Sequence, residues 1–521
     1  MKRIAATLLV FSIVVSTVRS QELWDTTAQR PKRELRAVWL TTLSGLDWPQ
    51  TKAKSPLDAE LQKQELCVLL DRLKRANINT VLFQTRIRGS VIYPSELEPW
   101  DACLTGTYGR SPGYDPLAFA IEETHRRGME LHAWVVTIPA FKPEMGKRMG
   151  KKSLLHTHPE LLKKHNGQYY LDPGLPGSAD YLSAILADFI DKYDIDGIHF
   201  DYIRYPENAY SFPDGATYKR YGKGQSKESW RRENITRIVR RLYQEVKARK
   251  PWVKMSSSPV GKYRDTQRYS SKGWNCYNTV FQDAQGWLEE GIQDALYPMM
   301  YFTGDHFYPF AADWQEGAGG RHVAPGLGIY FLHPREKDWD ISVITRELHY
   351  LRRRGLAGQA FFRCRFLTDN TKGIYDWLRD NFYAYPALPP TYEWLDSIAP
   401  QKPEGFTLPD ANGEMGELRW SPSADDSPGT VRYNIYASSS FPVDTEQPEN
   451  LIATLLPAPH YTFNLRTFLG YGLNLAVTAI DRCGNESEAA QLNFSQQEAP
   501  KRIPLNPLGR PVKAGQTEKR R

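Results

Sequence analysis

The stretch Asp196-Gly-Ile-His-Phe-Asp-Tyr-Ile-Arg-Tyr-Pro206 runs from an apolar segment into a carboxylate, an arginine and two tyrosines. The first half of the stretch is mostly apolar, as expected for a parallel strand that is buried on both faces. Asp201 comes near the end of this strand, and side-chain alternation places it on the same face as His199. We therefore expect a parallel sheet with an acid at its carboxyl edge, where His199 can hold or polarise the Asp201 carboxylate.

Strand patterns alternate with helical patterns from about residue 33 to residue 385. The predicted strands are 35–41, 80–86, 130–136, 197–203, 253–258, 295–301, 325–331 and 358–363. The predicted helices are 57–76, 116–127, 179–193, 227–249, 281–290, 342–354 and 372–381. Eight repeats of this kind favour a (β/α)8 TIM barrel over an open sheet, and we assign the barrel to residues 30–385.

The pattern changes after residue 385. Residues 386–400 are rich in proline and aromatic residues, which is typical of a linker. Residues 401–496 contain short stretches that alternate with period two, such as 417–420, 431–436 and 473–478. They predict a small all-β sandwich, which resembles a fibronectin type III module. Residues 497–521 are basic and are expected to be a disordered tail.

The first twenty residues have the features of a cleavable signal peptide. Met1-Lys2-Arg3 is positively charged, residues 4–15 are apolar, and small residues follow near position 20. The predicted location is therefore secreted or periplasmic, and a retained N-terminal anchor is the alternative. No later apolar run is long enough to cross a bilayer, so no transmembrane segment is expected in the mature chain.

Charge and cysteine content exclude several classes of protein. Most of the formal net charge of +7 lies in the two ends of the chain, so a nucleic-acid-binding groove is not expected. The five cysteines are widely spaced and do not form a disulfide or zinc framework. His156 and His158 form the one close histidine pair, and no carboxylate cluster completes a metal site. The sequence also lacks a phosphate-binding loop, so no metal and no cofactor are expected.

Acids and aromatic residues gather at the predicted strand ends, where barrel enzymes carry their active sites. Flat aromatic faces suit sugar rings, and a glycosidase normally uses two carboxyl groups. Asp201 is the predicted principal acid, with Asp283 and Asp305 as further catalytic candidates. The candidate substrate-binding residues are Trp39, Asp47, Trp48, Gln84, Arg86, His132, Trp134, His199, Tyr202, Arg204, Tyr205, Tyr301, Tyr330 and Arg363.

Several ordered motifs resemble the glycosyl-hydrolase-like ten family of secreted bacterial barrels. They are 33–39, 47–49, 171–176, 196–206, 281–283 and 298–301. The resemblance covers about residues 30–385 and implies a (β/α)8 glycoside hydrolase-like enzyme. At least one group of members of that family acts on cell-wall glycan strands without peptides. A weaker resemblance to chitinase-type barrels retains Asp201 but has Ile203 where that family has its catalytic glutamate.

The sequence leaves three functional hypotheses open. The leading one is an exported hydrolase of a polysaccharide that contains N-acetylhexosamine, with peptide-free peptidoglycan as its expected substrate. The second is a barrel that binds glycan without cleaving it, and the third is a hydrolase of a host or dietary polysaccharide. Two carboxyl groups about 5–10 Å apart favour hydrolysis, whereas an isolated acid favours binding.

Overall fold

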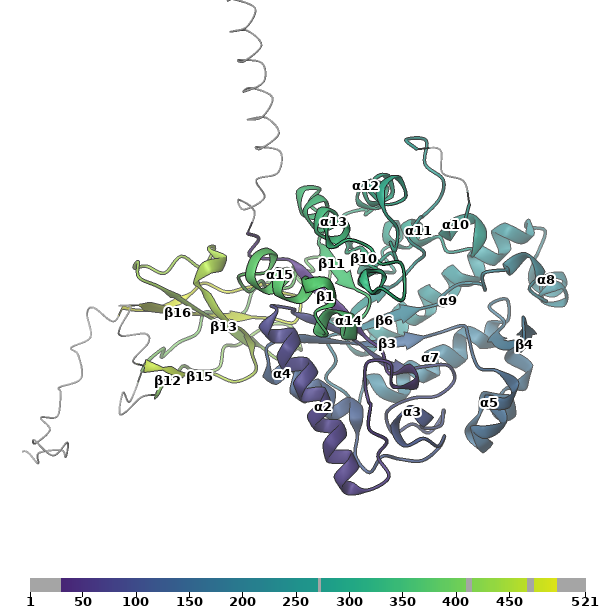
Figure 1. The fold of residues 1–521 in the computed structure, drawn as a ribbon, viewed down its shortest axis with the longest axis horizontal. Coiled ribbons are helices and arrows are strands. Elements are labelled where there is room, and N and C mark those ends of the chain that lie inside the picture. Colours follow the sequence, from purple (N-terminus) through teal and green to yellow (C-terminus); the bar gives the residue numbers. More distant parts are fainter. Residues whose placement is uncertain (1–29, 270–272, 409–414, 466–472, 494–521) are drawn as a thin grey trace, which may run out of the picture. The chain divides into compact units, whose positions relative to one another are not determined.

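The computed structural model describes residues 30–269, 273–408, 415–465 and 473–493. The chain divides into two compact units (Figure 1). The first unit contains the chain up to Ile398 together with Arg482–Asn485, and the second contains the remainder. The predicted signal peptide at 1–20 and the predicted tail at 497–521 lie outside the described residues.

A nine-stranded sheet, parallel throughout, forms the centre of the first unit. Its order is β10-β11-β1-β2-β3-β6-β7-β8-β9. The strands are β1 (Leu35–Leu40), β2 (Thr80–Arg86), β3 (Glu130–Val136), β6 (Gly197–Asp201), β7 (Lys254–Ser257), β8 (Ala295–Leu296), β9 (His322–Val323), β10 (Gly326–Leu327) and β11 (Gly358–Phe361). The mixed α/β class expected from the sequence is confirmed, because helices separate most of these strands along the chain.

The predicted strands at 295–301 and 325–331 are much shorter in the structure. Pro298 has no backbone N–H and interrupts the first, which survives only as β8. The second is preceded by an unpredicted strand, β9, and is itself reduced to β10. β9 pairs with β8 and β10 pairs with β11, while a parallel bridge joins Met299 to Gly326.

Helices surround the sheet of the first unit (Figure 1). The longer ones are α2 (Pro56–Arg75), α4 (Pro116–Arg126), α7 (Pro176–Ile190), α9 (Lys227–Arg249), α12 (Tyr308–Glu316) and α13 (Ile341–Arg353). The shorter ones are α3 (Ala102–Thr105), α5 (Pro143–Arg148), α6 (Leu154–Thr157), α8 (Gly215–Tyr221), α10 (Cys276–Thr279), α11 (Ala284–Glu289), α14 (Cys364–Thr368) and α15 (Ile374–Trp377). α2 shows how the sequence sets a boundary, since Ser55 and Asp58 form a capping box at its start.

A β-hairpin lies between β3 and α7, where the sequence had predicted only a loop. β4 (Leu162–His165) pairs antiparallel with β5 (Gln168–Leu171). Asn166 and Gly167 connect the strands with φ values of 47° and 76°. An Asn-Gly pair readily adopts two successive positive φ angles, and such turns match the twist of a hairpin.

The second unit is built from antiparallel strands. β13 (Arg432–Ser438), β14 (Leu451–Leu456), β16 (Asn474–Ile480) and β17 (Ala490–Leu492) form one sheet in the order β14-β13-β16-β17. β12 (Met415–Arg419) and β15 (His460–Asn464) form a separate pair. The hydrophobic core of the second unit includes Ile435 from β13 and Val477 from β16, which pack with Trp420.

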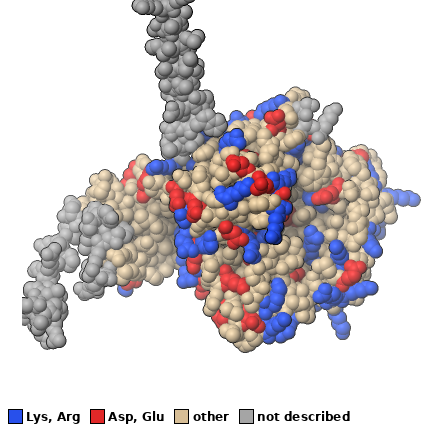
Figure 2. All heavy atoms as spheres, viewed as in Figure 1, with Lys and Arg blue, Asp and Glu red and all other residues tan. Residues whose placement is uncertain are grey.

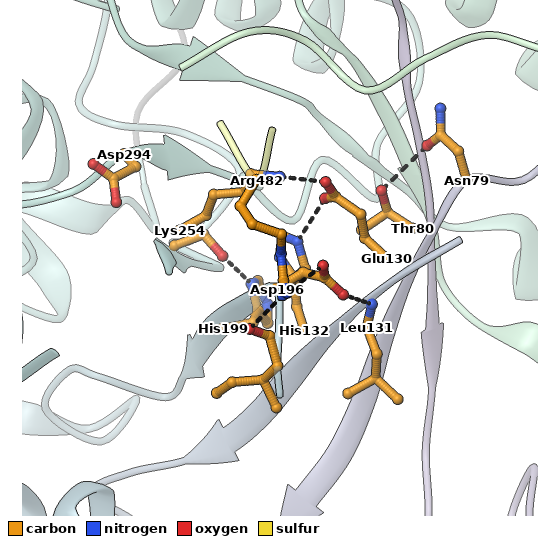
Figure 3. Close-up of polar contacts among 12 residues, drawn as sticks. Asn79, Thr80, Glu130, Leu131, His132, Asp196, His199, Lys254, Asp294 and Arg482 are labelled. Carbon is orange, nitrogen blue, oxygen red and sulfur yellow. Dashed lines mark hydrogen bonds and ion pairs between the residues drawn. The ribbon is translucent and has the colours of Figure 1, made fainter. Parts of the chain in front are cut away.

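The amino ends of the parallel strands hold a buried network of ion pairs (Figure 3). Lys254 at the start of β7 contacts Glu130 at the start of β3. Asp196 precedes β6, and its two oxygens lie 3.0 Å from the Arg482 guanidinium and 2.7 Å from His125 Nε2. Each of these two carboxylates thus lies against a basic group, as buried charges require.

Candidate functional site

Asp201 is the last residue of β6 and lies at the carboxyl edge of the sheet. Its side chain is held by three neutral donors. The Ser258 hydroxyl donates to Oδ1 over 3.0 Å, the Tyr202 N–H donates to Oδ1 over 2.7 Å, and Trp134 Nε1 donates to Oδ2 over 3.3 Å. Asp201 is only 6% exposed, and burial raises the pKa of its carboxyl above the ordinary value. The proton-bearing form therefore persists to higher pH than in an ordinary aspartate.

Tyr202 follows Asp201 with a φ of 53°, an unfavourable backbone angle for an aromatic residue. Thr137 helps to fix this conformation, since its N–H and hydroxyl both donate to the Asp201 carbonyl, at 3.0 and 2.9 Å. Strained angles of this kind concentrate at functional sites. The Tyr202 ring lies 4.8 Å from the Arg204 guanidinium and 6.0 Å from that of Arg88.

Tyr202 and Arg204 line a cleft of about 290 Å³. The β4–β5 hairpin contributes Asn166, Gln168 and Tyr170 to it. The other lining residues are Arg88, Pro139, Tyr205, Pro206, Glu207 and Asn208. The volume is close to the lower end of the range for small-molecule sites. Tyr202 and Arg204, one and three residues after Asp201, therefore lie in the wall of a polar and aromatic cleft.

Trp274 adds an exposed aromatic surface beside this cleft. Its ring lies 5.5 Å from the Arg204 guanidinium, and 40% of the residue is exposed. Trp274, Arg88 and the hairpin residues were not predicted as site residues from the sequence. The Asn-Gly pair was the signal that could have revealed the hairpin, whereas nothing local to Trp274 or Arg88 indicates their neighbours.

A second aromatic group lies near the ends of β8 and β11. The Tyr301 ring stacks on Phe362 with a centroid distance of 5.5 Å and meets the edge of Tyr330 at 5.8 Å. Burial raises the pKa of the Tyr301 hydroxyl, and the nearby Asp201 charge adds to the effect. Tyr301 thus lies within electrostatic range of Asp201.

Several of the other predicted binding residues have partners within the fold. Asp47 forms an ion pair with Arg363 and accepts 2.9 and 3.0 Å hydrogen bonds from the N–H groups of Thr41 and Arg365. Burial raises the pKa of the Asp47 carboxyl. Trp48 donates from Nε1 to the carbonyl of Gln62 over 2.8 Å and is fully buried.

Gln84 and Arg86, on β2, are likewise occupied. Gln84 Oε1 accepts hydrogen bonds from the Thr41 hydroxyl and the Leu43 N–H, both at 2.8 Å. Arg86 pairs in a fork with Glu98, and neither side chain is more than 1% exposed. These groups hold the loops after the strands in place.

The interior histidines do not contact Asp201. His199 Nε2 accepts a 3.1 Å hydrogen bond from Trp39 Nε1, and its Nδ1 lies 3.0 Å from the Ser256 hydroxyl. Burial holds the pKa of His199 well below its usual range, so its ring is neutral. The expected role of His199 in holding Asp201 falls instead to Ser258 and Trp134.

His132 and Tyr205 are also buried. His132 Nε2 lies 3.1 Å from Glu130, near the amino ends of the strands. The Tyr205 hydroxyl accepts a 3.1 Å hydrogen bond from the side-chain amide of Asn234. Neither arrangement brings the side-chain polar group to Asp201.

The two further acid candidates lie in different settings. Asp283 caps α11 by accepting from the Gly286 N–H at 3.3 Å, and it also accepts a 2.5 Å hydrogen bond from the Tyr263 hydroxyl. Asp305 lies in a short 3₁₀ helix after β8 and is exposed. Glu207, which the sequence analysis did not select, is the carboxylate that lines the cleft.

Comparison with known proteins gives these features a family context. The profile described as glycosyl hydrolase-like 10 matches residues 34–319. This chain belongs to that family. The glycosyl hydrolase YngK of Bacillus subtilis is 32% identical over 88% of this chain and 93% of its own length. The glycosyl hydrolase DigH of Escherichia coli K12 is 34% identical over 62% of this chain and 80% of its own length.

Solved glycosidases resemble this family member more distantly. The PgaB glycoside hydrolase domain from Bordetella bronchiseptica covers 67% of this chain and 98% of its own, with 16% identity and a TM-score of 0.48. The catalytic domain of a Paenibacillus polymyxa β-amylase covers 68% of this chain and 99% of its own, with 11% identity and a TM-score of 0.44.

Within residues 30–269, 273–408, 415–465 and 473–493, no three His, Cys, Asp or Glu side chains are grouped so as to hold a metal ion. No helix in the same residues is both long and apolar enough to cross a membrane. Acidic and basic side chains are interspersed on the visible face of the first unit (Figure 2).

Proposed function

We propose that this protein is an exported glycoside hydrolase that cleaves a polysaccharide containing N-acetylhexosamine, and that peptide-free peptidoglycan strands are its substrate. One observation carries the proposal. Asp201 is a carboxyl with a raised pKa at the carboxyl edge of a parallel sheet, next to residues that line a cleft. A general acid that works near neutral pH needs a raised pKa, and the shift at Asp201 is in that direction.

We further infer that the parallel sheet closes into a (β/α)8 barrel, with β9 and β10 as two pieces of the seventh strand. The Met299–Gly326 bridge supports closure, as do hydrogen bonds from Met300 N to Gly326 O at 3.0 Å and from Ala324 N to Leu296 O at 2.9 Å. In such barrels the carboxyl ends of the strands carry the chemistry. The antiparallel second unit is assigned to a fibronectin type III-like module at residues 401–496, after a linker at 386–400.

In the proposed reaction Asp201 donates its proton to the oxygen that links two sugars. The bond from that oxygen to the anomeric carbon breaks, and its electron pair stays with the leaving sugar. Water then supplies the hydroxyl group at the anomeric carbon, and a carboxylate accepts the proton that the water loses. The products are two shorter glycans, and Asp201 is reprotonated for the next cycle.

A second carboxyl group is needed for this water or for a covalent intermediate. Glu207 lines the cleft, and its carboxylate lies 3.9 Å from the Arg204 guanidinium. Asp305 is exposed and remains a candidate, whereas Asp283 is engaged in capping α11. We rank Glu207 first because it shares a cleft with Tyr202.

The test is incubation of purified protein with peptidoglycan strands from which the peptides have been removed. The wild type should release short sugars, and Asp201→Asn should release none above background. Chitin fragments and host glycosaminoglycans serve as competing substrates. Cleavage of the host glycans alone would show that the substrate is a host or dietary polysaccharide and not peptidoglycan.

A non-catalytic glycan-binding protein is the alternative, and one observation favours it. The Asp201 oxygens already accept from three donors, and the residue is 6% exposed. Binding to the strands without release of sugars, by both the wild type and Asp201→Asn, would establish this alternative.

A further inference from the structure

We propose that the cleft beside Tyr202 is a subsite for a carboxylate-bearing sugar, in which Arg88 and Arg204 bind the carboxylate. The inference deepens the proposed function and rests on it for the identity of the glycan. Its direct basis is a pair of arginines that line one cleft and face one tyrosine ring.

Arg204 is buried without a full set of partners. It is only 4% exposed, and its Nε–H has no hydrogen-bond acceptor among the described residues. One terminal nitrogen donates to the Tyr205 carbonyl over 3.2 Å, and the Glu207 carboxylate lies 3.9 Å away on an exposed side chain. A buried guanidinium with a spare donor is costly unless a ligand completes its hydrogen bonds.

Arg88 has even fewer partners. It follows β2 and is half-buried, and within the described ranges no carboxylate forms an ion pair with it. Its charge lowers the pKa of the Tyr170 hydroxyl, as does that of Arg204, against a larger rise caused by burial. The two guanidinium groups therefore act on the same cleft wall.

The other lining groups fit one sugar ring. Tyr170 and Tyr202 supply aromatic surfaces, while the side-chain amides of Asn166, Gln168 and Asn208 suit hydroxyl and acetamido groups. The two arginines and Glu207 leave one unit of positive charge among the lining residues. One carboxylate balances that charge, and guanidinium forks match carboxylate geometry.

The subsite gives a physical reason for a substrate without peptides. In wall glycan, the lactyl group of every second sugar is a free carboxylate only when no peptide is joined to it through an amide bond. An attached peptide removes the negative charge of the lactyl group and adds bulk next to the two arginines. An amide hydrolysis must therefore precede this enzyme.

Binding measurements test the subsite separately from catalysis. The ligands are the disaccharide of N-acetylglucosamine and N-acetylmuramic acid, neutral chitobiose, and a disaccharide that carries a uronic acid. They are titrated by calorimetry into full-length Asp201→Asn, which cannot cleave them if the proposed function holds. Arg88→Gln and Arg88→Lys are added to this background, with Arg126→Gln on the exposed side of α4 as the charge-matched control.

The muramic disaccharide should bind at least tenfold more tightly than chitobiose, since hydrogen bonds to charged groups contribute this much. Arg88→Gln should remove the difference, Arg88→Lys should retain part of it, and Arg126→Gln should leave it unchanged. Tighter binding of the uronic disaccharide would keep the carboxylate subsite but assign it to a uronic acid glycan.

Equal affinity for chitobiose and the acidic sugars would overturn the subsite, as would the same loss in Arg126→Gln. Arg204→Gln is a second variant, used only if its melting temperature matches that of the parent. Arginine-dependent binding without cleavage of any strand by the wild type would reject the hydrolase while retaining the subsite. Cleavage by the wild type with no preference for acidic sugars would retain the hydrolase and reject the subsite.

Discussion

Asp201, at the carboxyl ends of the parallel strands, differs from the buried carboxylates at the amino ends in how its charge is matched. At the amino ends, Glu130 lies against Lys254, and Asp196 lies against Arg482 and His125. At the carboxyl ends, Asp201 receives hydrogen bonds only from neutral donors, although the charge of Arg204 acts on it from a distance. The charges at the amino ends are paired, whereas at the carboxyl ends Asp201 and Arg204 lie without a close ion pair beside paired groups such as Arg86 with Glu98.

This difference separates structural charges from chemical ones. A buried ion pair is satisfied within the fold and gains nothing from a ligand. A buried carboxyl with neutral donors holds a proton more readily, and an arginine with a spare N–H can accept an anion. We therefore place the chemistry at the carboxyl ends and the structural role at the amino ends.

The largest expected effect comes from Asp201→Asn. Removal of the proton donor should lower kcat on stripped glycan strands by about 10²- to 10⁴-fold. The fold should persist, because the amide oxygen can still accept from Ser258 and the Tyr202 N–H. Steady-state rates measure the loss of kcat, and circular dichroism checks that the fold persists. A variant that keeps more than half of the wild-type kcat would contradict the assignment.

Lys254→Met tests the opposite end. It leaves the Glu130 carboxylate buried without its lysine and should reduce the free energy of unfolding by about 3–5 kcal/mol. Denaturant titration measures the loss, and kcat at low temperature should stay near that of the wild type. The pair Glu130→Gln with Lys254→Met should recover most of the stability. A large loss of kcat in well-folded Lys254→Met would contradict the assignment of a purely structural role to the amino ends of the strands.

The exposed ring of Trp274 should have a moderate effect. Its replacement in Trp274→Ala should raise KM about two- to tenfold, which corresponds to the loss of one aromatic contact. The melting temperature should hardly change because the residue is 40% exposed. An unchanged KM would remove Trp274 from the glycan-binding surface.

The smallest effect is expected for the solvent-exposed pair of Arg268 and Glu316. Both side chains are about half exposed, so Glu316→Gln should cost less than about 1 kcal/mol of unfolding free energy. The same denaturant titration on Lys254→Met shows how much more unfolding free energy a buried ion pair contributes than an exposed one. A loss as large as that of Lys254→Met would mean that burial does not decide the strength of these pairs.

Sequence patterns predicted the elements whose signals are local. β2 and β3 have the predicted bounds because each contains a short apolar run, at residues 81–83 in β2 and 133–136 in β3. α9 also has its predicted bounds, with Ser226 as its N-cap. β8 and β10 are shorter than predicted, because an apolar composition does not show where proline or sheet geometry ends the pairing.

The sequence predicted the position of Asp201 on its strand but not the residues that contact it. The position of Asp201 at the end of β6 follows from the apolar run before it. Its partners Trp134 and Ser258 come from other strands, and neither choice follows from spacing. Arg482 is still more remote, since it lies 288 residues after Asp194, which it contacts. Contacts of this range depend on the whole fold.

The most direct test of the account is the titration of the Asp201 carboxyl itself. Difference infrared spectroscopy of the wild type against Asp201→Asn, over a range of pH, isolates the signal of this group. We predict a carboxyl that stays protonated above the ordinary pKa of 3.8, with kcat/KM falling as pH rises through the same midpoint. Titration at or below 3.8, or a kcat/KM that does not follow it, would contradict the role of Asp201 as the proton donor.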